Sequence, residues 1–291
     1  MAFVHPQSCE CTKSELDLFI VPPTQTSIEA GTYVEYNPIS SISQGAPIEF
    51  SITGAGQDYL YLSNTQLYVR AQIVRANDNA IDDTDHVGPV NLLLHSLFSE
   101  VDISLNDTLV TASNNTYAYR SYLETILSYG DAAKTSQMTS ALFYKDTASH
   151  FEDANPHDAN GRNTGFKRRS ALIEDGRVVD MIGGIHSDLF FQDRFLPNDI
   201  NIRIRLVRNK DAFCLMSTAA GAAYKVRILE CKLYVRKVKL SPSIFLAHAK
   251  ALEVGNVKFP VRRAICKLLP YREETWMQPR KVYSLVNYRL E

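Results

Sequence analysis

The sequence has 291 residues, enough for one large β domain or two small ones, and its 45% hydrophobic and 22% charged residues are typical of a folded globular chain. A formal net charge of −1 excludes the overall basic character of a nucleic-acid-binding domain. No stretch approaches the roughly 20 apolar residues of a membrane helix, and the N-terminal residues lack the apolar core of a signal peptide.

The cysteines are few and odd in number, which favours a reducing compartment over a disulfide scaffold. They are Cys9, Cys11, Cys214, Cys231 and Cys266. Because no secretory signal is found either, we expect an intracellular location, in nucleus or cytoplasm, and not a secreted protein.

Alternation of apolar and polar residues with a period of two predicts strands over most of the chain. The predicted strands are residues 47–52, 59–62, 67–73, 101–105, 178–182, 188–191, 200–206, 212–216 and 224–240. The clearest is 200–206, in which Ile200, Ile202, Ile204 and Leu206 alternate with polar residues. After the strand at 101–105, the pair Asn106-Asp107 predicts a tight turn.

The longest predicted strand, residues 224–240, changes phase in its middle. Val226 and Ile228 share one parity, whereas Cys231, Leu233 and Val235 share the other. A β-bulge at residues 229–230 would return all of these side chains to one buried face.

Three segments predict helices instead. The spacing of Tyr119, Leu123, Ile126 and Leu127 predicts a helix over residues 117–129. A weaker helix is predicted at 134–143, so that 117–143 forms a helical insertion in one long loop between strands.

The third predicted helix, residues 244–253, has clear end signals. Ser241 can act as its N-cap, Pro242 suits the first helical position, and Gly255 follows its end. Many short strands separated by turn residues predict an all-β, antiparallel sandwich or barrel, with the helical insertion in one loop and this helix after the last long strand.

The best candidate for catalysis is a metal site formed by His186, Asp188 and His248. Two histidines and one carboxylate hold iron in non-haem oxygenases, and on a strand His186 and Asp188 would point to the same side. Three such residues match by chance in many chains, and His248 falls in the middle of a predicted helix. We therefore predict no catalytic, cofactor-binding or metal-binding residues.

Other motifs are weaker. Cys9-Glu10-Cys11 has the wrong spacing for a zinc pair, and Gly54-Ala55-Gly56 lacks the third glycine of a dinucleotide loop. The acidic run at residues 82–85 lacks the spaced ligands of a calcium loop and is interpreted as a solvated loop.

Charge is unevenly distributed. The first 100 residues hold 3 Lys/Arg and 12 Asp/Glu, whereas residues 223–291 hold 15 and 5. Several basic residues follow the last long strand, namely Arg227, Lys232, Arg236, Lys237 and Lys239. Weak DNA contact through this basic C-terminal part is one interpretation, and a solvated strand face is the favoured one.

Aromatic residues are the other surface signal. Tyr59, Tyr61, Tyr68 and Tyr119 could line a ligand surface, but such residues more often pack a sandwich core or a subunit interface.

Several long segments resemble the major capsid proteins of Polinton/Maverick elements and adintoviruses. The strongest are GPVNLLLHSLFSEVDISLND at 88–107 and TYAYRSYLETILSYG at 116–130. Others are SCECTKSELDLF at 8–19, VPPTQTSIE at 21–29, SALFYKDT at 140–147, DLFFQDRFLPNDINIRIRLVRNKDAFCLM at 188–216 and RKVKLSPSIFLAHAKALE at 236–253.

The resemblance implies a double jelly roll, two barrels standing side by side, with three subunits forming a capsomer and many capsomers tiling an icosahedral shell around double-stranded DNA. It implies an N-terminal arm at 1–28, a jelly-roll barrel at 29–240 and a linker helix at 241–255. Residues 258–267, KFPVRRAICK, resemble the first strand of a second barrel. The match fades after about residue 267, so we expect 256–291 to be the stub of a truncated second barrel.

We therefore expect a structural subunit of a virus-like capsid, found in the virion, with other copies of itself and other capsid proteins as partners. Self-association would rest on apolar and aromatic surface along the barrel sides. A lone barrel would also expose the face that meets its twin, so we expect an oligomeric or poorly soluble chain. The alternatives are the metal-dependent oxygenase and a domesticated jelly-roll binding protein, because jelly rolls host many functions.

Overall fold

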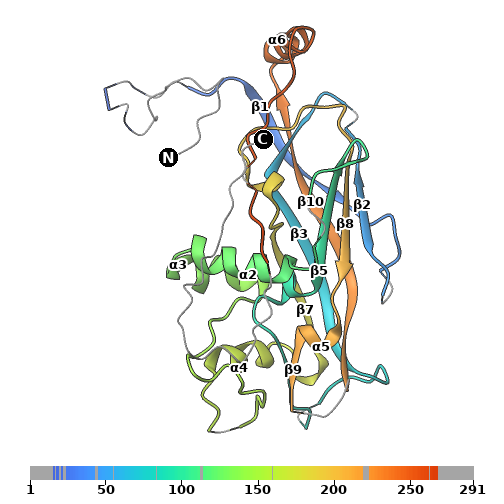
Figure 1. Ribbon diagram of the computed structural model, residues 1–291, viewed down its shortest axis with the longest axis vertical. Helices are drawn as coiled ribbons and strands as arrows, with labels where there is room; N and C mark the ends of the chain where they lie inside the picture. The colour runs from blue at the N-terminus through green and yellow to red at the C-terminus, as the bar shows by residue number, and fades with distance from the viewer. Residues whose placement is uncertain are drawn as a thin grey trace, which may run out of the picture.

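Alternating apolar residues fold the chain into two four-stranded antiparallel sheets packed face to face, with helices gathered along one side (Figure 1). The computed structural model describes residues 16–267, apart from residues 17, 20, 22, 23, 43, 44, 55, 83, 112, 113, 159, 219–222 and 262. Residues 1–15 of the expected arm, with Cys9 and Cys11, and residues 268–291 lie outside the described residues.

The order of the strands is that of a jelly roll, which confirms the expected fold class. One sheet contains, in spatial order, β1 (Ile28–Tyr36), β10 (Tyr224–Leu240), β3 (Tyr59–Arg75) and β7 (Val178–Gly184). The other contains β2 (Ile48–Ile52), β8 (Ile202–Arg208), β5 (Phe98–Leu105) and β6 (Thr108–Leu109). The first strand, β1, therefore pairs with the last, β10. A smaller pairing joins β4 (Val87–Pro89) and β9 (Leu215–Ser217).

The core lies between the two sheets and follows the predicted alternation. Phe50 of β2 pairs with Ile204 of β8, and both are fully buried. Arg203 and Arg205, which flank Ile204 in β8, face outward. At the end of β5, Asn106 and Asp107 have φ values of 44° and 65°, which confirms the predicted tight turn into β6.

The predicted bulge is confirmed in β10. The register of β10 against β3 shifts between Ile228 and Glu230, and Leu229 is 41% exposed. Beyond the shift, Cys231 and Leu233 return to the core. One inserted residue thus keeps residues 226–235 of this 17-residue strand facing the same core, and a second register shift follows between Tyr234 and Arg236.

Two predicted strands are wrong. Residues 188–191 form the 3-10 turn η4 (Asp188–Phe191), because neighbouring Leu189 and Phe190 are both buried and do not alternate across a sheet. Residues 211–214 form the short helix α5 (Asp211–Cys214), and only Leu215–Ser217 continue as β9. The predicted strand at 59–62 exists, but as the first part of β3.

Helices lie mainly in the long connection between β6 and β7. They are α2 (Tyr117–Ser128), α3 (Asp131–Thr135), the 3-10 turn η2 (Gln137–Ala141), α4 (Thr164–Ala171) and the 3-10 turn η3 (Glu174–Gly176). The second predicted helix is thus two shorter pieces, and α4 lies where no element was predicted. The short α1 (Leu93–Ser96) follows β4. In the described part of the chain, no helix is both long enough and apolar enough to span a membrane.

The predicted helix after the last long strand is α6 (Pro242–Leu252), which stands beyond the end of the sandwich (Figure 1). None of its residues is buried. Residues 258–261 and 263–267, which resemble the first strand of a second barrel, pair with no strand among the described residues.

The bulge predicts a contrast between two leucines of β10. Leu233→Ala should reduce the free energy of unfolding by about 2–5 kcal/mol, because Leu233 is fully buried. Leu229→Ala should change it by no more than about 0.5 kcal/mol, because Leu229 lies on the exposed side of the bulge. Urea unfolding measures both, and equal losses would contradict the bulge.

Candidate functional site

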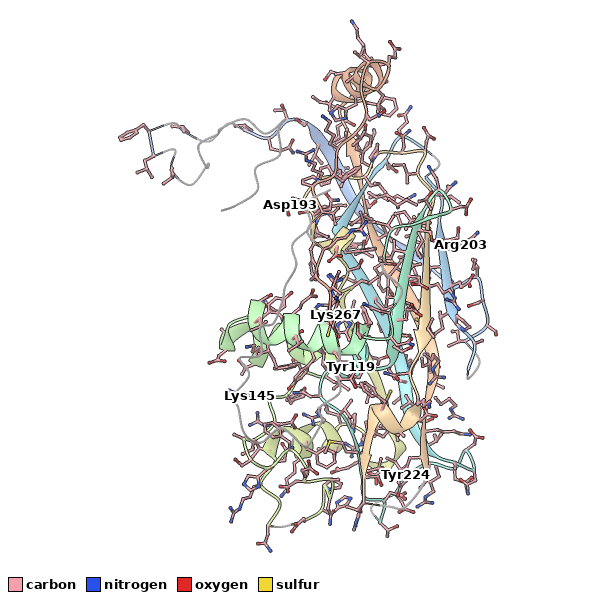
Figure 2. The ribbon with its side chains drawn as sticks, in the orientation of Figure 1. Tyr119, Lys145, Asp193, Arg203, Tyr224 and Lys267 are labelled. Atoms are coloured by element: carbon pink, nitrogen blue, oxygen red, sulfur yellow. The ribbon has the colours of Figure 1, made fainter. Side chains whose placement is uncertain are left out.

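The helix α2 turns four large apolar side chains toward solvent, whereas Tyr117 is buried and Tyr122 packs against the core. We call Tyr119, Leu123, Ile126 and Leu127 the α2 outer face; Leu123 is 49% and Leu127 82% exposed. Figure 2 shows α2 projecting at the side of the sheets, with Tyr119 near its sandwich end. A surface helix normally buries its apolar stripe, so four exposed apolar side chains on one face of α2 are unusual.

The buried side of α2 combines small side chains with the ring of Tyr117, which is 5% exposed. Ser121 and Thr125 are fully buried, and each hydroxyl donates to a carbonyl of the same helix, that of Ala118 at 2.9 Å and that of Ser121 at 2.8 Å. These bonds satisfy the buried hydroxyls without a partner from the sandwich. Ser121 and Thr125 therefore let this side of α2 pack closely, while Leu123 and Leu127 stay outside.

A network of charged side chains fixes this orientation. Arg120 Nε donates to Glu124 Oε1 at 2.8 Å, one turn along α2, and the same guanidinium pairs with Asp188 of η4. Glu124 Oε2 lies 2.8 Å from His186 Nδ1, in the segment between β7 and η4. These four side chains, the anchor network, are mostly shielded from solvent, so each charge has a close partner of opposite sign or a hydrogen bond.

Two aromatic rings extend the network inward. Tyr117 Oη lies 3.0 Å from His95 Nδ1, and the rings of His95 and His186 meet edge to face at 4.6 Å between centroids. Burial, together with the nearby His186, lowers the pKa of His95 well below its ordinary value, so His95 is neutral at physiological pH. Burial also raises the pKa of Tyr117. The innermost part of the site is therefore uncharged.

The electrostatics of the anchor network favour its charged form. Burial alone would raise the pKa of Glu124, but the hydrogen bond from His186 and the charge and hydrogen bond of Arg120 outweigh it, so the pKa lies below its ordinary value. For Arg120, burial would lower the pKa, but Glu124 and Asp188 raise it overall. The Arg120–Glu124 pair is therefore ionised at neutral pH.

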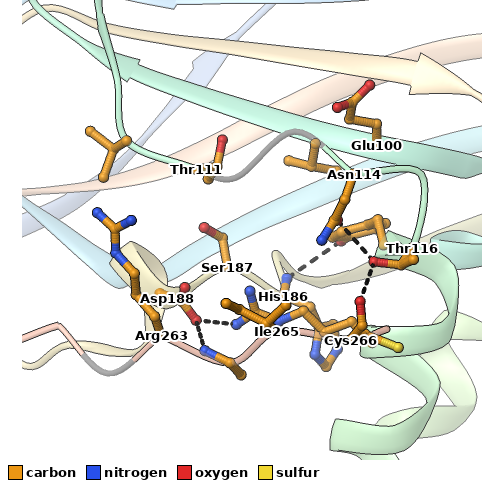
Figure 3. Close-up of a pocket in the computed structure, with 15 residues that line it drawn as sticks. Glu100, Thr111, Asn114, Thr116, His186, Ser187, Asp188, Arg263, Ile265 and Cys266 are labelled. Atoms are coloured by element: carbon orange, nitrogen blue, oxygen red, sulfur yellow. Dashed lines mark hydrogen bonds and ion pairs between the residues drawn. The ribbon is translucent and has the colours of Figure 1, made fainter. Parts of the chain in front are cut away.

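The segment that follows α6 contacts the anchor network. The backbone nitrogen of Ala264 donates to Asp188 Oδ1 at 3.2 Å, and Thr116 Oγ1 donates to the Cys266 carbonyl at 3.4 Å. These contacts surround a cavity of about 70 Å³ (Figure 3). That volume is far below the roughly 300–1,000 Å³ of small-molecule pockets, so the site holds elements together and has little room for a ligand.

The three residues of the predicted metal site do not meet. His186 and Asp188 are neighbours, but they bind Glu124 and Arg120, and the guanidinium occupies the side of Asp188 where a cation would sit. His248 lies on α6 at a different cavity, where its Nδ1 is 3.1 Å from Tyr59 Oη. Over the described residues, no group of three His, Cys, Asp or Glu side chains is arranged to hold a metal.

The acidic loop serves a structural purpose. Arg75 Nη2 lies 2.7 Å from a carboxylate oxygen of both Asp82 and Asp85, and Tyr224 Oη donates to Asp85 at 2.9 Å. These contacts tie the loop to the ends of β3 and β10. The guanidinium thus takes the place that a cation would need.

Two of the five cations of the basic strand pair with glutamates. Lys232 Nζ lies 2.7 Å from Glu230 and 3.0 Å from Glu35, and Lys239 Nζ lies 3.0 Å from Glu29. Arg236 and Lys237 lie over the rings of two β1 tyrosines. This arrangement agrees with the favoured interpretation of a solvated strand face.

The sequence-based search missed Arg120, Glu124 and His95. Arg120 and Glu124 are four residues apart on a predicted helix, a spacing that indicates an ion pair but not its burial. His95 gives no local signal, because its partners Tyr117 and His186 are distant in sequence.

Comparison with known proteins agrees with the strand order. No protein-family model matches the chain. Among solved structures, it superposes on a chain of the Sputnik virophage with a TM-score of 0.51 and 13% identity, over 81% of this chain and 53% of that one. The chain therefore shares a jelly-roll fold with that chain of the virophage.

Two further similarities are to a viral protein and to a nematode protein. The mavirus major capsid protein is 13% identical and matches 91% of this chain and 56% of its own, with a TM-score of 0.42. The uncharacterised protein F54H12.2 of Caenorhabditis elegans is 25% identical over 250 residues, which are 83% of this chain and 57% of that protein. The chain therefore spans little more than half the length of these proteins.

The anchor network predicts a stability cost for its central cation. Arg120→Met should reduce the free energy of unfolding by about 3 kcal/mol, because it leaves Glu124 and Asp188 shielded from water without their partner. Arg70→Met removes an exposed ion pair with Asp180 and should cost less than about 1 kcal/mol. Chemical unfolding compares them, and equal costs would rule out an anchoring role for Arg120.

The lowered pKa of Glu124 predicts a pH dependence. The contribution of this carboxylate to stability is complete above its unfolded-state pKa of roughly 4.3 and is lost as the pH falls through the lower folded-state pKa. The stability advantage of the natural chain over Glu124→Gln should therefore shrink between pH 6 and pH 3. Urea unfolding at both pH values measures it, and a constant difference would contradict the account.

Proposed function

We propose that this chain is a structural subunit of an icosahedral virus-like capsid of the Polinton/Maverick type, and that the α2 outer face is a surface through which copies associate. The observation that carries the proposal is the exposure of four large apolar side chains on a helix whose other side is anchored by shielded ion pairs. Such a surface is unfavourable in water unless a partner covers it.

The fold supports a building role. The similarity in fold is to viral major capsid proteins, and the Sputnik virophage chain provides the match in structure. The inward faces of both sheets are filled by side chains, so the sandwich holds a packed core between its sheets. The same similarity favours a subunit without catalytic activity, located in a virion.

The chemistry of α2 suits a protein interface. Tyrosine and leucine side chains form its centre, while Arg120 and Glu124 lie on its flank next to the sandwich. Interfaces commonly combine an apolar and aromatic centre with a polar rim. Because the anchor network holds α2 in place, little conformational entropy would be lost when a partner covers it.

The partners that follow are other copies of this chain, with a homotrimeric capsomer as the expected first assembly, and other capsid proteins around it. A weak DNA contact through the basic C-terminal part remains a secondary expectation. The pairing of Lys232 and Lys239 with glutamates limits how much of β10 could serve it.

The test places charge on the α2 outer face. In sedimentation velocity, the natural chain should associate at micromolar concentration, and the double variant Leu123→Glu/Leu127→Glu should associate roughly 10–100-fold more weakly. The reason is that two carboxylates would have to lose their hydration in the interface. Circular dichroism should show that the variant remains folded.

A matched control is available on β10. Leu229 is 41% exposed, close to the 49% of Leu123, but lies outside α2. Leu229→Glu should therefore associate like the natural chain. A natural chain that is monomeric, or equal effects of the two changes, would overturn the proposal.

A further inference from the structure

An apolar groove lies between α6 and the end of the sandwich. Its volume is about 720 Å³, far larger than the cavity at the anchor network. Its walls include Leu240 at the end of β10, Phe195, Ile244 and Leu252 of α6, and Phe259. None of the α6 residues that line it is buried, so the groove is an apolar surface without a cover.

The described part of the N-terminal arm carries apolar side chains that are exposed to solvent. Leu16, Leu18, Phe19 and Val21 are 67%, 77%, 96% and 86% exposed. Figure 1 shows this part of the chain lying away from the sandwich. Four large apolar side chains within six residues are thus mostly exposed to solvent, which is an unfavourable arrangement for an isolated chain.

The arm leaves the sandwich at the rim of the groove. Gln25 lines the groove and is held there, because its side chain exchanges hydrogen bonds with Ile28, at 2.7 Å from the Ile28 nitrogen and 3.3 Å from its carbonyl. Before this fixed point, the described residues 16, 18, 19 and 21 lie away from the sandwich (Figure 1). The arm is therefore placed to reach a neighbouring subunit.

The net charges of the arm and of the segment beside the groove have opposite signs, which favours their contact. Residues 1–24 contain three acidic side chains and one lysine, whereas residues 242–267, which include α6 and one wall of the groove, contain five Lys/Arg and one glutamate. Arg194, His248 and one acidic side chain, Asp193, line the groove. An arm of acidic and apolar residues thus complements an apolar groove that adjoins a segment of net positive charge, residues 242–267.

We propose that the arm of one subunit, through Leu16, Leu18, Phe19 and Val21, binds in the groove between α6 and the sandwich of a second copy of this chain. Exchange of an identical segment between copies is a low-cost route to a symmetric oligomer, because the contact already suits the chain's own surfaces. This contact is separate from the α2 outer face and does not depend on it.

The experiment uses two single variants of the full chain. Phe19→Glu places a carboxylate on the arm, and Leu252→Glu places one in the groove. In sedimentation velocity each variant alone should associate at least about tenfold more weakly than the natural chain, because every arm–groove pair then contains one buried carboxylate. Val254→Glu is the control, since Val254 is 91% exposed next to α6 but does not line the groove, and it should have no effect.

Mixing the variants distinguishes exchange from its alternatives. In an equimolar mixture, the intact arm of the Leu252→Glu chain can enter the intact groove of the Phe19→Glu chain, so association should partly recover. If each arm binds its own groove, mixing restores nothing and the proposal fails. It also fails if Phe19→Glu has no effect, as expected if another segment or an apolar small molecule fills the groove. If only the α2 variants lose association and the arm and groove variants do not, the exchange is ruled out. The proposed function, which rests on the α2 outer face, would still hold.

Discussion

The position of Arg120 between two carboxylates is the constraint on which the insertion depends. A guanidinium shielded from water needs close partners, and here they come from two places: Glu124 on its own helix and Asp188 in η4. Rotation of α2 about its axis would separate Arg120 from Asp188 and Glu124 from His186 at the same time. The apolar outer face of α2 is therefore held outward by polar contacts on the inner side, at the cost of exposing leucine and tyrosine to water.

The jelly roll supplies the fixed frame for this constraint. β7 ends at Gly184, and the next residues bring His186 and Asp188 to α2, so the sheet sets the position of the network. The segment after α6 joins the same site through Ala264. Three parts of the chain that are far apart in sequence thus meet at one point. A substitution in the anchor network would therefore affect both the helical insertion and the segment after α6. A surface held in this way is suited to repeated, identical contacts between copies.

Much of the fold follows from local pattern. The strands β8 and β10, the bulge at Leu229, the Asn106-Asp107 turn and the bounds of α2 and α6 could be predicted, because each depends on periodicity or turn chemistry within a few residues. The strand predicted at 188–191 was wrong because consecutive burial of Leu189 and Phe190 is decided by the surrounding fold. The site was less predictable. Helical spacing shows which residues of α2 share a face, but only partners 62 and 68 residues away show which way that face points.

The central claim is that the α2 outer face contacts another copy of the chain, and site-specific photo-cross-linking tests it most directly. A photoreactive phenylalanine analogue at position 127 would be compared with one at Arg203, which is exposed on the outer side of β8 (Figure 2). The account predicts covalent links between subunits from position 127 and few from position 203. Equal yields from the two positions, or no links from position 127 under conditions where the chain is oligomeric, would contradict it.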